Sequence, residues 1–104
     1  MNITEEPYTR LHALREEIDA SDKELLRLLN QRALLSLELG RVKARISETG
    51  KPDNIFNPQR ERQVLDNLAS WNTGVLPRRH IENIWREILS SSRVLQRPLR
   101  VAYP

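Results

Sequence analysis

The stretch from Leu11 to Ile46 carries apolar side chains at alternating steps of three and four residues, the spacing of one face of an α-helix. The members of this face, called the seam below, are Leu11, Leu14, Ile18, Ser21, Leu25, Leu28, Arg32, Leu35, Leu39, Val42 and Ile46. No proline interrupts the seam, so we predict one helix of roughly 38 residues, about 57 Å long. We expect it to begin between Pro7 and Arg10.

Arg32 is the seam position that departs most from the apolar pattern. A guanidinium in an apolar face costs several kcal/mol unless an anion meets it, so we expect an anionic partner for Arg32. Lys43 follows eleven residues later, close to three helical turns, and therefore points the same way about 16 Å along the helix. Two long cationic side chains at that separation can converge on one small anionic molecule.

Two shorter helices follow. Asn57 and Pro58 are a favourable cap and first position for a helix that runs to about Ser70, after a loop over residues 47–55. Its apolar face comprises Val64, Leu65, Leu68 and Trp71. Pro77 opens a third helix, which Pro98 ends, with an apolar face made of Ile81, Ile84, Trp85, Ile88, Leu89 and Leu95. We therefore predict an all-α fold with three helices per chain, one of them very long.

The long helix carries more apolar surface than the two short helices can cover. They span about 20 Å and about 30 Å, enough for one side of it. Further leucines lie outside the seam at Leu26, Leu29, Leu34 and Leu37. A lone chain would expose them as a patch larger than soluble proteins usually tolerate, so we predict a homodimer whose long helices pack against one another. A glycine inside this helix, Gly40, either admits a close partner helix or a ligand, or is merely tolerated.

Composition excludes several classes of function. The chain has 104 residues and no cysteine, so it is one domain at most, without a disulfide framework or thiolate metal site. His12 and His80 lack metal-site spacing, and no metal is expected. No segment resembles a signal peptide or a membrane span, so we expect a soluble, cytoplasmic protein without a membrane partner. The net charge of +3 is modest, and acidic and basic residues are interleaved along the chain. Both features argue against nucleic-acid binding.

A few polar residues on the three helices are candidates for chemistry. Glu61 and Arg60 lie in the first turn of the second helix, while Ser92 and Gln96 continue the apolar row of the third helix. Ser92 and Gln96 therefore either lie at the solvent-exposed end of the helix or line a pocket as hydrogen-bond donors. The candidates include cations, an acid, a hydroxyl and an amide, but no activated nucleophile or general base. An enzyme built from them would act by positioning and electrostatic stabilisation.

The sequence resembles the all-helical chorismate mutases of the AroQ class. The resemblance rests on LxxLRxxIDxxDxxLLxLLxxR from Leu11 to Arg32, ELGRVK from Glu38 to Lys43, PQRERQVL from Pro58 to Leu65, and IENIWREILSSS from Ile81 to Ser92. It implies an intertwined homodimeric helical bundle that converts chorismate to prephenate in phenylalanine and tyrosine biosynthesis, without a cofactor. It also implies that residues 1–97 are the mutase domain. The segment 98–104 then resembles a linker, or the first strand of a dehydratase in a bifunctional chorismate mutase–prephenate dehydratase.

The resemblance also implies a role for each candidate residue. Arg32 and, from the partner subunit, Arg15 would bind the two substrate carboxylates. Lys43 would donate to a carboxylate and to the ether oxygen whose bond breaks, and Gln96 would donate to that ether oxygen from the other side. Glu61 would accept from the ring hydroxyl and Ser92 would contact a carboxylate. Arg60 would add positive field, whereas Arg93 is interpreted as a surface charge.

Three alternatives remain open. An isochorismate-pyruvate lyase would share this fold and much of the site. A mutase-like domain could serve only in regulation or dimerisation. A basic helical nucleic-acid binder is the third alternative, although the sequence contains no recognised recognition helix.

Overall fold

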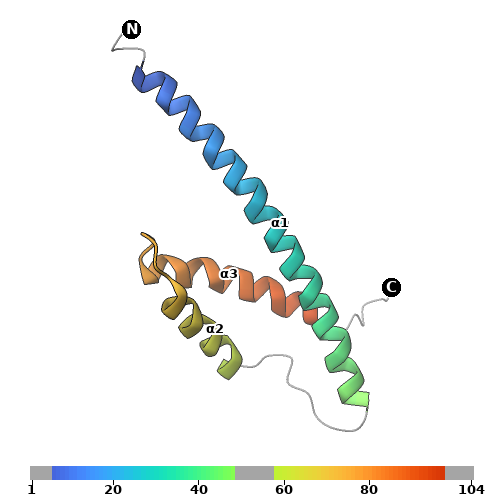
Figure 1. The fold of residues 1–104 in the computed structure, drawn as a ribbon. Helices are drawn as coiled ribbons and strands as arrows, with labels where there is room; N and C mark the ends of the chain where they lie inside the picture. Colours follow the sequence, from blue (N-terminus) through green and yellow to red (C-terminus); the bar gives the residue numbers. More distant parts are fainter. Residues whose placement is uncertain (1–5, 49–57, 98–104) are drawn as a thin grey trace. The chain divides into compact units, whose positions relative to one another are not determined.

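The computed structural model describes residues 6–48 and 58–97, which form three α-helices (Figure 1). Helix α1 is Glu6–Glu48, α2 is Pro58–Trp71 and α3 is Arg78–Gln96. The described ranges contain no β-strand, so the predicted all-α class with one very long helix is confirmed. The predicted cap at Asn57, most of the loop before it and the expected strand near the end of the chain lie outside the described residues.

Helix α1 is 43 residues long, more than the sequence predicted, and it extends beyond both expected ends. It begins at Glu6, so Pro7 lies in the first turn, where a missing N–H removes no intrahelical hydrogen bond. It also includes Ser47, which the prediction placed in the loop. The helix-breaking residues Thr49 and Gly50 come only after its last residue, Glu48, which explains the error.

The chain divides into two compact units, residues 1–32 and 33–104, with the boundary inside α1. In the first unit the described residues, 6–32, belong to α1 alone, and none of them is buried. In the second unit, residues 33–48 of α1 are joined by α2 and α3. Every buried residue of the described ranges therefore belongs to the second unit.

The apolar interior of the second unit is small. Among the described residues, Ile81 and Leu89 are the buried hydrophobic side chains, and both lie on the predicted apolar face of α3. The apolar side chains buried within a single copy of the described residues are therefore limited to these two.

Helices α1 and α3 approach each other closely at Gly40. A Cβ added to Gly40 would lie 2.5 Å from the carbonyl oxygen of Gln96 and 2.8 Å from its Cα, closer than real Cβ atoms come to other atoms. Of the two sequence interpretations of this glycine, close approach by a neighbour is therefore confirmed. The missing side chain allows the last turn of α3 to pack directly on the backbone of α1.

The connection between α2 and α3 is organised by Asn72. Its backbone N–H donates to the carbonyl oxygen of Leu68, and its side-chain amide donates to the carbonyl oxygen of Leu76 at 2.9 Å. Its Oδ1 accepts from the backbone N–H of Gly74 at 3.0 Å, a turn that asparagine favours. Helix α2 ends at Trp71, one residue beyond the predicted end near Ser70, and the Trp71 side chain is 69% exposed within one chain.

The seam of α1 faces outward. Its apolar members are 38–61% exposed, from Val42 at the low end to Leu35 at the high end. Leu26, Leu29 and Leu34, outside the seam, are exposed as well. In the described ranges no helix combines the length and the apolar content needed to cross a membrane. This long apolar surface therefore remains uncovered within one chain.

Candidate active site

A chain of hydrogen bonds joins α1 to α3 in the second unit. The Lys43 ammonium donates to Oε1 of Gln96 at 2.8 Å, and Nε2 of Gln96 donates to Oγ of Ser92 at 3.0 Å. The hydroxyl of Ser92 is in turn 2.6 Å from that of Ser36. Ser36 and Lys43 are seven residues apart on α1, while Ser92 and Gln96 are four apart on α3, so each pair lies on one face of its helix. We call these four residues the polar chain.

The polar chain is largely removed from solvent. Ser36, Ser92 and Gln96 are 5%, 7% and 9% exposed, and Lys43 is half-buried. Buried polar groups are unfavourable unless they are hydrogen-bonded, and each member of the polar chain has such a partner. The interpretation that Ser92 and Gln96 lie at a solvent-exposed end of α3 is therefore wrong. They are donors and acceptors held in a protected position beside an ammonium group.

Chemistry fixes the orientation of the Gln96 amide. A lysine ammonium only donates hydrogen bonds, so the amide atom that faces Lys43 must be the carbonyl oxygen. The NH2 group then faces Ser92, where it uses one of its two N–H groups. The polar chain therefore contains two kinds of N–H donor, the Lys43 ammonium and the Gln96 amide, and such donors stabilise a developing negative charge.

Glu61 and Arg93 form an ion pair between α2 and α3. Nη1 of Arg93 lies 2.6 Å from one carboxylate oxygen of Glu61 and 2.5 Å from the other, and the two side chains are 33% and 23% exposed. Both residues also line a pocket between α2 and α3 whose volume is about 490 Å³. The interpretation of Arg93 as a simple surface charge was therefore wrong, because it is the ion-pair partner of a predicted site residue.

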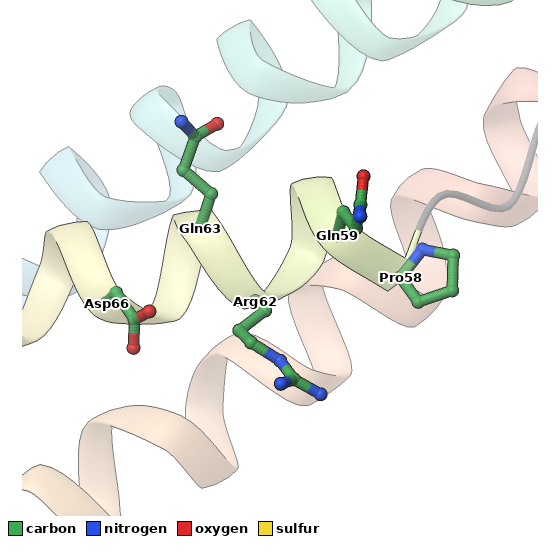
Figure 2. Close-up of a pocket in the computed structure, with 5 residues that line it drawn as sticks. All are labelled: Pro58, Gln59, Arg62, Gln63 and Asp66. Carbon is green, nitrogen blue, oxygen red and sulfur yellow. The ribbon is translucent and has the colours of Figure 1, made fainter.

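A second hollow, of about 460 Å³, is lined by α2 alone. Figure 2 shows its lining residues, which are Pro58, Gln59, Arg62, Gln63 and Asp66. None of the predicted site residues lines this hollow. Arg60 lies nearby in the first turn of α2, where it is exposed and donates to Oε1 of Gln63 at 2.7 Å. The structure thus leaves the predicted role of Arg60 untested.

Arg15 and Arg32 belong to the first unit. Arg15 is exposed. Arg32 is half-buried, whereas every other seam position of α1 is exposed. The grouping of these two arginines with the polar chain remains a prediction. In contrast, the structure brings together Lys43, Gln96 and Ser92, and it adds Ser36, to which no sequence signal pointed.

Other charge interactions lie on exposed helix surfaces. Arg27 lowers the pKa of Glu24 through a side-chain hydrogen bond, and Glu82 raises the pKa of Arg78 in the same way. Exposed pairs of this kind contribute little to stability. Across residues 6–48 and 58–97, no three acidic or histidine side chains gather as metal ligands would. The described site is therefore defined by its ammonium, amide and hydroxyl groups.

Comparison with known proteins places the chain in a family. A family model described as chorismate mutase type II matches residues 14–97, which include the whole polar chain. The chain belongs to the chorismate mutase type II family. The resemblance inferred from the sequence motifs is thereby confirmed.

Curated relatives of this chorismate mutase family member are considerably longer than the chain. The bifunctional chorismate mutase/prephenate dehydratase of Pseudomonas aeruginosa is 37% identical over 94 residues, which are 90% of this chain and 26% of the relative. A protein of the same name from Aquifex aeolicus is 38% identical over 97 residues, covering 89% and 25% of the two chains. The chain thus spans about a quarter of the length of these relatives.

Solved structures agree with the family assignment. Form II of chorismate mutase from Thermus thermophilus is 37% identical and has a TM-score of 0.73, covering 84% of this chain and 93% of its own. Form I of that protein is also 37% identical, with a TM-score of 0.69 and coverages of 80% and 98%. The fold of this chain is therefore that of a chorismate mutase.

Proposed function

We propose that this chain converts chorismate to prephenate, and that the polar chain is part of the site where the reaction occurs. One observation carries the proposal. The ammonium of Lys43 and the amide of Gln96 meet at 2.8 Å in a protected position of a chorismate mutase type II chain. These are the two residues whose N–H groups the family resemblance assigns to the ether oxygen of the substrate.

The reaction needs hydrogen-bond donors at the ether oxygen of the substrate, and the described residues include such donors. In this rearrangement the ether C–O bond breaks while a C–C bond forms within the same molecule, and no proton or covalent intermediate is required. Negative charge develops on the ether oxygen in the transition state. Lys43 and Gln96 would donate to that oxygen and stabilise the charge, while the closed site holds the reactive conformer.

The substrate has two carboxylates and a ring hydroxyl that need partners. We assign Ser92 and Arg32 to the carboxylates, together with Arg15 of a second copy of the chain, because charge-assisted hydrogen bonds bind carboxylates well. Glu61 would accept from the ring hydroxyl, and Arg60 would contribute positive field. These assignments are supported by the sequence motifs and, for Ser92, by its hydrogen bond to Gln96.

The proposed assembly is a homodimer formed through α1. The exposed seam supports it, since a single chain leaves side chains such as Ile18, Leu25 and Leu35 at least 56% exposed. The small interior of the second unit supports it too, because the chain needs more buried apolar surface than it can provide alone. A second copy would also supply Arg15, which lies four heptads before Lys43 in the sequence.

The test is product analysis with purified protein. Incubation with chorismate should consume the substrate and yield prephenate without an added cofactor. Replacing Lys43 by Ala should lower turnover by orders of magnitude, as removal of one such donor does elsewhere. Lys23→Ala, the same change at an exposed position of α1, should leave turnover unchanged.

Other outcomes identify other functions. Formation of salicylate from isochorismate, without prephenate from chorismate, would assign the chain to lyase chemistry and contradict the proposal. A folded protein that consumes neither compound would indicate a regulatory or dimerisation domain.

A further inference from the structure

Ser36 is the member of the polar chain to which the proposed reaction gives no role. It lies on α1 four residues before Gly40 and seven before Lys43, and it is 5% exposed. Its hydroxyl is 2.6 Å from that of Ser92, which comes from α3. A buried serine at this distance from Ser92, a predicted substrate-binding residue, can set the direction in which the Ser92 hydroxyl donates.

The number of protons on the two hydroxyls determines which of them donates to the other. A serine hydroxyl donates one hydrogen bond and accepts up to two. The oxygen of Ser92 already accepts from Nε2 of Gln96. A substrate carboxylate can only accept, so Ser92 must use its single proton to bind one. Its bond to Ser36 then exists only if Ser36 donates and Ser92 accepts.

We propose that Ser36 is a positioning residue of this site, which donates to Ser92 and thereby directs the Ser92 hydroxyl toward the substrate carboxylate. The inference rests on the proposed function. Without substrate, the proton between the two hydroxyls can belong to either oxygen. When a carboxylate binds, the direction becomes fixed, with Ser36 donating to Ser92 and Ser92 donating to the ligand.

The same bonds hold Gln96 in place. With Ser36 donating to it, the Ser92 oxygen accepts from two neighbours and donates to a third, which uses its full hydrogen-bonding capacity. The oxygen therefore remains on the side from which Nε2 of Gln96 donates, while Oε1 of Gln96 remains directed at Lys43. Ser36 thus acts on the substrate through Ser92 and does not touch the substrate itself.

The test is a double-mutant cycle on kcat/KM for chorismate. Ser36→Ala should lower kcat/KM about three- to tenfold, the effect of losing one ordinary hydrogen bond. In a Ser92→Ala background the same change should have no further effect, because Ser36 acts only through Ser92. Ser91→Ala, the same substitution at the exposed neighbouring position of α3, should stay within twofold of the wild type.

A merely structural role for Ser36 predicts a different pattern. Ser36→Ala would then lower the unfolding temperature and leave kcat/KM within twofold of the wild type, which would overturn the proposal. Equal losses of kcat/KM in the wild-type and Ser92→Ala backgrounds would overturn it as well. Ser36→Cys keeps nearly the same volume with a much weaker donor, so it provides the same comparison if the alanine variant does not fold.

Failure of this inference can be told apart from failure of the proposed function. An active wild type whose kcat/KM is insensitive to Ser36→Ala and Ser36→Cys would remove only the role of Ser36. A wild type that forms no prephenate would overturn both.

Discussion

The two parts of α1 on either side of the unit boundary share one exposed apolar seam but differ on the rest of their surface. Residues 6–32 include no buried residue, although leucine and isoleucine recur along their seam. Residues 33–48 supply Ser36, Gly40 and Lys43, whose positions are fixed by α3 within the same chain. The face that α3 covers is therefore not the seam, which stays exposed in both parts.

The largest expected effect comes from charging the seam in the first part of α1. The double substitution Ile18→Asp and Leu25→Asp would place four carboxylates in the interface of a two-fold dimer, at a cost of several kcal/mol. We expect the dimer to be lost at micromolar concentration, with a large loss of helix content. Sedimentation velocity and circular dichroism measure both.

Lys23→Asp is the matched control for that variant, because it introduces the same side chain at an exposed position outside the seam. It should leave assembly unchanged. If the charged seam variant instead remained a folded dimer, or if the wild type sedimented as a folded monomer, the first part of α1 would not be an interface.

A smaller effect is expected from filling the contact in the second part of α1. Gly40→Ala places a Cβ against the backbone of Gln96, which cannot rotate away as a side chain would. We expect a loss of about 1–3 kcal/mol in the free energy of unfolding. The shift of α3 should also lower kcat/KM at least about tenfold, since small displacements of catalytic groups have large effects on rate.

Gly74→Ala provides the comparison for Gly40→Ala. A Cβ at Gly74 would meet only the side-chain oxygen of Asn72, at the ordinary contact distance of 3.7 Å. Urea unfolding and steady-state kinetics should therefore show near wild-type behaviour for Gly74→Ala. Equal effects of the two alanine variants would mean that the contact between Gly40 and Gln96 does not control the site.

The smallest effect is expected at the ion pair between α2 and α3. Arg93→Ala removes the partner of Glu61, but both side chains are partly exposed, so solvent screens the interaction. We expect a loss of about 1 kcal/mol or less in the free energy of unfolding. Most of that loss should be absent when Glu61 is already alanine.

Arg86→Ala is the control for the ion pair, since Arg86 lines the same pocket as Glu61 but has its partners, Asn83 and Glu82, on its own helix. Its effect should depend less on Glu61 than the effect of Arg93→Ala does. Urea unfolding of the single and double variants measures the coupling. A coupling between Arg93 and Glu61 no larger than that between Arg86 and Glu61 would show that the pair contributes nothing specific.

Much of the fold could be predicted from local signals. Seam spacing identified α1 and Pro58 marked the start of α2, because each acts through its own backbone or its nearest turns. The predicted ends of α1 were several residues too short. Helix ends depend on weak differences between neighbouring residues, which sequence pattern resolves poorly.

The site was only partly predictable, for a physical reason. Lys43 and Ser92 belong to quoted motifs, and the family resemblance pointed to both of them and to Gln96. Ser36 and Arg93 act through partners far away in the sequence, separated from Ser92 and Glu61 by 56 and 32 residues. No periodicity encodes such pairs, and only the packing of the helices reveals them.

The most direct test of the central claim is kcat/KM for chorismate in Gln96→Ala, measured with prephenate as the identified product. Gln96 joins Lys43 to Ser92, and we propose that its amide donates to the reacting oxygen. We predict a fall of at least about a hundredfold relative to the wild type, as for other donors that stabilise developing charge. Gln59→Ala, at an exposed position of α2, should remain within twofold. A Gln96→Ala protein that forms prephenate at the wild-type rate would contradict the account.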